Sequence, residues 1–138
     1  MVIIMSMGYG ARLEKVLEDE QTVFYYYSCG NANYKNYDIM INKQDGEILV
    51  DKRCFLEPEI HVKLKRMPGG RKKLVEKRIH VNVPYTEYIR AGLIKIKNAS
   101  GCWKTIDEID IMALKLLFKL FDEYQEESKI PDRISWFS

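Results

Sequence analysis

The chain has 138 residues, of which 46% are hydrophobic and 30% charged, and its formal net charge is +2. This size and composition predict a single α+β domain, residues 1–138, and exclude a disordered chain. The apolar runs are too short and too often interrupted to cross a bilayer, so no membrane association is expected. The first seven residues, MVIIMSM, lack the basic and cleavage regions of a signal peptide and predict a first strand.

The three cysteines, Cys29, Cys54 and Cys102, are odd in number and far apart in the sequence. This pattern favours reduced, buried thiols over a disulfide framework, and reduced thiols are typical of the cytoplasm. Together with the absence of a signal-peptide pattern, this predicts a cytoplasmic protein.

The first half of the chain has the composition of an antiparallel sheet. Residues 22–28, TVFYYYS, are β-branched and aromatic, which favours a strand. Residues 37–42 and 47–52 are expected to pair as a hairpin, because the intervening Asp45-Gly46 is a typical positive-φ turn.

Residues 57–67 fit two patterns, because their apolar positions suit either a strand or one stripe of a helix. Pro58 at a first helical position, early acids, and Lys65 and Arg66 near the end favour a short helix that Pro68 stops. The basic stretch that follows, from residue 71, is expected to form a strand instead. A helix there would place its cations at the positive end of the dipole.

The last third predicts a short helix over residues 84–91, a strand over 93–97, and then one long helix. Thr105-Ile106-Asp107-Glu108 matches a capping box, so the helix is expected to begin there and to run to about Glu127. Its apolar surface is wider than one sheet face can cover. The tail IPDRISWF, the short helices or a second subunit should cover the rest, so a homodimer is one expectation. The predicted fold is an antiparallel sheet of about five strands packed against this long C-terminal helix, with short connecting helices.

The basic segment, residues 61–80, holds eight bases and one acid. Gly69-Gly70-Arg71 lacks the spacing and the hydroxyl of a phosphate-binding P-loop. The segment could be a solvated connection, a nucleic-acid surface or a surface for an acidic protein. Its candidate binding residues are Lys63, Lys65, Arg66, Arg71, Lys72 and Lys73.

A second candidate surface is the Tyr/Asn-rich stretch of residues 25–38, YYYSCGNANYKNYD. Tyrosine, serine, glycine and asparagine are typical of adaptable recognition loops, and the candidates here are Tyr26, Tyr34 and Tyr37. The alternative is that the tyrosines cover the outer face of a sheet while the asparagines turn the chain.

Catalytic signals are weak. His61 and His80 could join a cysteine at a metal or as a nucleophile pair, but no two ligands have the spacing of a metal site. No catalytic residue, metal ligand or cofactor is therefore predicted. The sequence favours a small binding protein of regulatory or inhibitor type that acts through protein–protein contacts. A nucleic-acid-binding protein is the alternative, and a Cys/His-dependent enzyme is the second alternative.

Overall fold

A computed structural model describes residues 9–31, 43–100, 105–106 and 108–137 of the chain. Its strands are β1 (Tyr9–Glu18), β2 (Thr22–Asn31), β3 (Gly46–Asp51), β4 (Glu59–Arg66), β5 (Lys72–Ile79), β6 (Ile94–Lys97), β7 (Thr105–Ile106), β8 (Ile109–Asp110) and β9 (Arg133–Phe137). Its helices are the 3-10 turn η1 (Lys52–Cys54) and the α-helices α2 (Tyr85–Arg90) and α3 (Ile111–Glu127).

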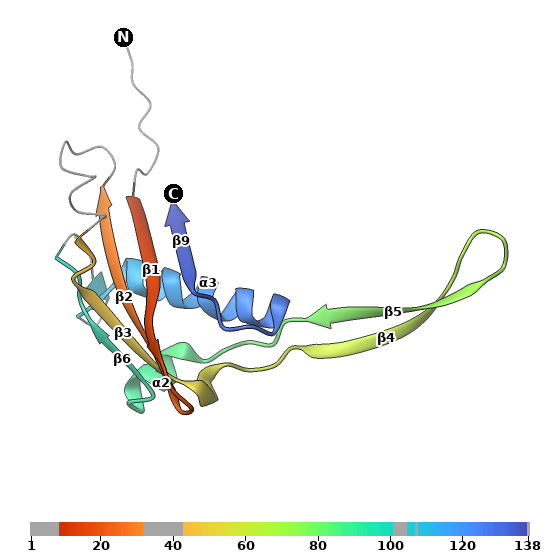
Figure 1. Cartoon of the computed structure of the whole chain (residues 1–138), viewed down its shortest axis with the longest axis horizontal. Helices are drawn as coiled ribbons and strands as arrows, with labels where there is room; N and C mark the ends of the chain where they lie inside the picture. Colours follow the sequence, from red (N-terminus) through yellow and green to blue (C-terminus); the bar gives the residue numbers. More distant parts are fainter. Residues whose placement is uncertain (1–8, 32–42, 101–104, 107, 138) are drawn as a thin grey trace, which may run out of the picture.

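A five-stranded antiparallel sheet with the order β6-β3-β2-β1-β9 forms the body of the molecule, and α3 lies across one of its faces (Figure 1). The predicted α+β fold is thereby confirmed. The C-terminal strand β9 pairs with β1 at the sheet edge and also packs against α3, as expected for the tail.

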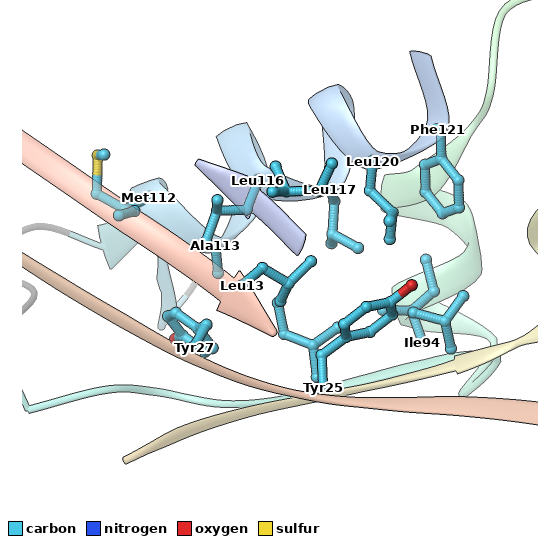
Figure 2. Packing of buried hydrophobic residues seen from close by; sticks show 14 of the residues in the cluster. Leu13, Tyr25, Tyr27, Ile94, Met112, Ala113, Leu116, Leu117, Leu120 and Phe121 are labelled. Carbon is cyan, nitrogen blue, oxygen red and sulfur yellow. The ribbon is translucent and has the colours of Figure 1, made fainter. Parts of the chain in front are cut away.

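The core lies between the inner face of the sheet and α3 (Figure 2). Every second residue of β2 points inward, and Val23, Tyr25 and Tyr27 are fully buried. They meet Leu116, Leu117 and Leu120 of α3, which are also fully buried. Fully burying an aliphatic side chain contributes about 1.5–3 kcal/mol, so this layer supplies much of the driving force for folding.

The long helix begins later than its capping box predicts. Thr105 and Ile106 pair with Ile109 and Asp110 in the small β7–β8 hairpin, and α3 starts at Ile111. The buried Asp110 carboxylate accepts hydrogen bonds from the Tyr27 hydroxyl at 2.6 Å and from the Ala99 amide at 2.9 Å. These tertiary bonds fix the chain ahead of the helix, so the capping-box prediction is wrong.

The stretch 57–67, predicted as a helix, contains the strand β4 (Glu59–Arg66) instead. β4 pairs with β5 in an unbroken register from Glu59↔Ile79 to Arg66↔Lys72. The turn between them contains Gly69 and Gly70 with φ of +93° and +90°, a backbone conformation that favours glycine. This ladder and turn outweigh the local helix signals, because they satisfy the backbone of both segments.

The prediction that Asp45-Gly46 forms a positive-φ turn is also wrong. Gly46 lies in β3 without a positive φ, and a Cβ on it would lie 2.4 Å from the Tyr27 ring. The glycine is needed for this close approach. Its predicted partner strand, residues 37–42, lies outside the described residues, as does the predicted first strand MVIIMSM.

Other predictions are confirmed. α2 and β6 lie within a residue of their expected bounds, and Gly92 ends α2 with a φ of +79°. In contrast, Cys29 is disulfide-bonded, so the prediction of three reduced thiols is wrong. Within the described part of the chain, no helix is both long and apolar enough to span a membrane.

Candidate functional site

Strands β4 and β5, with the turn between them, form an arm (residues 59–79) that projects from the body of the molecule (Figure 1). It is inserted between β3 and β6, which are neighbours in the sheet. Every residue of both strands is exposed to solvent. A two-stranded ribbon without a third strand or a helix over it is only marginally stable in water, so this arm is a strong candidate for a contact surface.

The two faces of the arm differ in chemistry, as its register shows. Residues that pair directly across antiparallel strands share a face, and successive residues alternate between faces. One face, called here the even face, carries the pairs Ile60·Arg78, Val62·Glu76, Leu64·Leu74 and Arg66·Lys72. Four of its side chains are aliphatic and between 48% and 68% exposed: Ile60, Val62, Leu64 and Leu74. Four uncovered aliphatic side chains in adjacent rows are typical of an interaction site.

The opposite face, the odd face, is mainly cationic. It carries Lys63, Lys65, Lys73 and Lys77, together with the less exposed Val75 and Ile79. The predicted basic residues are therefore divided. Lys63, Lys65 and Lys73 lie on the odd face, Arg66 and Lys72 lie beside the aliphatic rows on the even face, and Arg71 lies in the turn.

The base of the arm is fixed to the C-terminal half of α3. The buried Gln125 side chain pairs with Val81, accepting from its amide at 2.6 Å and donating to its carbonyl at 2.8 Å. Arg78 donates to the Gln125 carbonyl at 3.0 Å and to the Ser128 hydroxyl at 2.7 Å. Because Arg78 belongs to the even face, this face turns toward the end of α3.

An ion-pair cluster adds to this attachment. The two ring nitrogens of His80 lie 2.7 Å from an Asp122 oxygen and 2.8 Å from a Glu126 oxygen. The hydrogen bond to Asp122, followed by that to Glu126, raises the pKa of His80 above its usual 6.5, despite partial desolvation. Nearby, the Tyr124 hydroxyl donates to Glu57 at 2.5 Å, and this bond raises the pKa of Tyr124 to about 12.

A groove of about 460 Å³ lies beside the base of the arm, between residues 80–85 and α3. Its walls include Val83, Phe118 and Phe121, and Asp122 contributes a carboxylate. Phe118 is 56% exposed although it belongs to the long helix. The groove therefore offers apolar surface next to negative charge.

The tyrosine stretch is only partly a surface. Tyr25 and Tyr27 are buried in the core, and this burial raises the pKa of both hydroxyls. Tyr26 points to the outer face of the sheet, 39% exposed, with its ring 5.4 Å from that of Phe24. Tyr34 and Tyr37 lie outside the described residues.

Among the described residues, Cys54 is buried and both histidines contact carboxylates. Cys54 is fully buried, and burial raises its pKa to about 11, which disfavours the reactive thiolate. His61 lies 3.2 Å from the Glu59 carboxylate, and His80 is held by α3 as described above. In the described ranges, no three histidine, cysteine or acidic side chains gather as a metal site would require.

Sequence reasoning missed the aliphatic side chains of the even face and the role of Gln125. The alternation of Ile60, Val62 and Leu64 before Pro68-Gly69-Gly70 was the available signal, since Gly-Gly is a common hairpin turn. Comparison with family models, with curated proteins and with solved structures finds no match to this chain.

Proposed function

We propose that this chain is a small binding protein of regulatory or inhibitor type, which acts by laying the even face of its arm on another protein. The observation that carries the proposal is the group of four exposed aliphatic side chains on one face of a projecting ribbon. Each is about half exposed, so covering all four contributes about 4 kcal/mol before the entropic cost of association.

The charge of the arm specifies the kind of partner. Residues 59–79 hold eight bases and two acids, which gives the arm a net charge of +6 with histidine neutral. Arg66 and Lys72 border the aliphatic rows directly. A complementary surface is an apolar groove bordered by carboxylates, which also steers the encounter through long-range attraction.

A nucleic-acid function explains fewer features of the arm. Phosphates would cover the lysines of the odd face, but the aliphatic even face would then remain in water. A protein partner on the even face accounts for both sides, because the odd-face lysines keep the arm hydrated and discourage edge-to-edge pairing. A Cys/His-dependent enzyme is disfavoured by the buried Cys54, whose pKa is raised to about 11.

The cytoplasmic location remains a prediction, and the proposal does not depend on it. One of its two supports was the prediction of three reduced thiols, which is wrong because Cys29 is disulfide-bonded. Disulfides persist mainly in oxidising compartments, so this bond is an argument against the cytoplasm.

The test compares two matched double variants in adjacent rows of the arm. Leu64→Ser/Leu74→Ser removes the most exposed row of the even face, and Lys65→Ser/Lys73→Ser removes the next row, on the odd face. Both rows are exposed and outside the core, so each variant should stay within about 0.5 kcal/mol of the wild-type stability per changed residue.

Affinity capture from cell extract should recover the same protein with the wild type and the lysine variant, and lose it with the leucine variant. Capture that the lysine variant loses and the leucine variant keeps would refute the proposal. Retention on DNA at low salt that the lysine variant loses and the leucine variant keeps would establish the nucleic-acid function instead.

A further inference from the structure

We infer that the protein on which the arm lies is a second copy of this chain, and that the two copies exchange arms. This inference rests on the proposed function, because it names the partner of the even face. It comes from a second surface of the same chain, whose chemistry complements that of the arm.

The complementary surface is the groove together with the adjoining half of α3. Residues 118–127 contain one lysine and four acids, a net charge of −3, whereas the arm carries +6. The groove supplies the exposed Phe118 beside the Asp122 carboxylate, and Glu126 follows one turn later. His80 also lines the groove and is hydrogen-bonded between Asp122 and Glu126, so it offsets part of their negative charge. The groove is still an apolar surface bordered by an excess of carboxylates, which is the kind of surface that the even face requires.

The arm of one molecule cannot bring its turn to its own groove. Eight strand residues at about 3.3 Å each place the turn about 26 Å from the base of the arm, where the groove lies. Figure 1 shows the arm leading away from α3. Arg66 and Lys72, at the turn end of the even face, are thus far from the carboxylates of their own helix.

A two-fold axis near the middle of the arm removes this separation. When two arms lie antiparallel, the turn of each reaches the base of the other, where the partner's Asp122 and the partner's Glu126 border the groove. At its base the even face turns toward α3, as the bonds of Arg78 show. The aliphatic side chains and the cations near the turn belong to this same face of the ribbon. One arm and one groove per copy then make two equivalent contacts, which closes the assembly as a dimer.

A charge-reversal experiment on the full chain tests the exchange. One variant, Arg66→Glu/Lys72→Glu, makes the turn end negative. A second, Asp122→Lys/Glu126→Lys, makes the helix surface positive and also removes the bonds to His80 at the base of its own arm. Alone, each variant places like charges in both contacts. In a one-to-one mixture, the mixed dimer has one wild-type contact and one contact with both signs reversed, so both contacts are attractive.

Sedimentation equilibrium should show a wild-type dimer whose dissociation constant rises with salt, because the contacts include charges. Each variant alone should dimerise at least about tenfold more weakly, and the mixture should recover most of the wild-type affinity. This recovery also excludes misfolding as the reason for the losses. Leu64→Ser/Leu74→Ser should abolish dimerisation while Lys65→Ser/Lys73→Ser retains it.

Two results would overturn the inference: a wild type that stays monomeric at its highest attainable concentration, or a mixture that associates no better than its components. If face-specific capture of another protein persists in either case, the proposed function stands and only the identity of the partner is wrong. If dimerisation and capture both survive the leucine variant, the even face is not a contact surface and both proposals fall.

Discussion

Replacing Gln125 with methionine should loosen the attachment of the arm to α3. Methionine has nearly the same length and fits the same buried position, but it makes neither hydrogen bond to Val81. The Gln125 side chain is 2% exposed, and it bonds to both the amide and the carbonyl of Val81, at 2.6 and 2.8 Å. The substitution thus removes a pairing that resembles one rung of a β-ladder.

The size of the effect follows from what the Val81 backbone loses. A buried polar group without a partner costs about 1–3 kcal/mol, and Gln125→Met leaves two such groups. Val81 is only half-buried, so water partly replaces the lost bonds, and we expect a loss of about 2 kcal/mol in the free energy of unfolding.

Urea denaturation measures this loss, and hydrogen exchange of the Val81 amide locates it. The matched control is Glu127→Met, at an exposed position of the same helix, which should change stability by less than about 0.5 kcal/mol. If the two variants are equally stable and the Val81 amide keeps its protection, the Gln125 pairing does not anchor the arm.

Three further predictions concern the core and the base of the arm. Leu120→Ala should cost about 2–5 kcal/mol in urea denaturation, whereas Phe118→Ala should cost less than Leu120→Ala because Phe118 is 56% exposed; equal losses would place the core elsewhere. Tyr27→Phe should cost about 1.5–3 kcal/mol by the same assay, since the buried Asp110 carboxylate loses a charge-assisted donor, and an unchanged stability would contradict this role. The raised pKa of His80 means that its contribution to stability is complete below pH 6.5 and lost as the pH rises through the folded-state pKa. The melting temperatures of the wild type and His80→Gln should therefore converge as the pH becomes alkaline. A difference between them that widens at alkaline pH would contradict the stabilising role of protonated His80.

Much of the fold follows from local patterns. The β-branched and aromatic stretch of β2 and the apolar stripe of α3 each specify one element, because no competing pattern fits them equally well. Pro84 and Gly92 bound α2 by backbone geometry alone. Where two patterns fit, as in residues 57–67, local signals favoured the helix and a ladder with β5 decided for the strand.

The candidate site was only half visible in the sequence. The concentration of cations between residues 61 and 80 correctly indicated a solvent-exposed segment, but not that it projects as a two-stranded arm. Its aliphatic residues carried no such mark, because an alternating strand normally turns them toward a core. Likewise, the capping box at Thr105 is a sound local pattern that loses to the bonds joining Asp110 to Tyr27 and Ala99.

The sequence by itself determined the elements that depend on neighbouring residues: the body strands β2, β3 and β6, the long apolar helix and the sign of charge along each segment. The body strands β1 and β9 were not predicted. Only the tertiary structure decided which apolar side chains are covered. It places those of β2 beneath α3 and leaves Ile60, Val62, Leu64 and Leu74 in water. The physical reason is that burial depends on what lies opposite a side chain in space, and in the described chain no element covers these four aliphatic side chains of the arm.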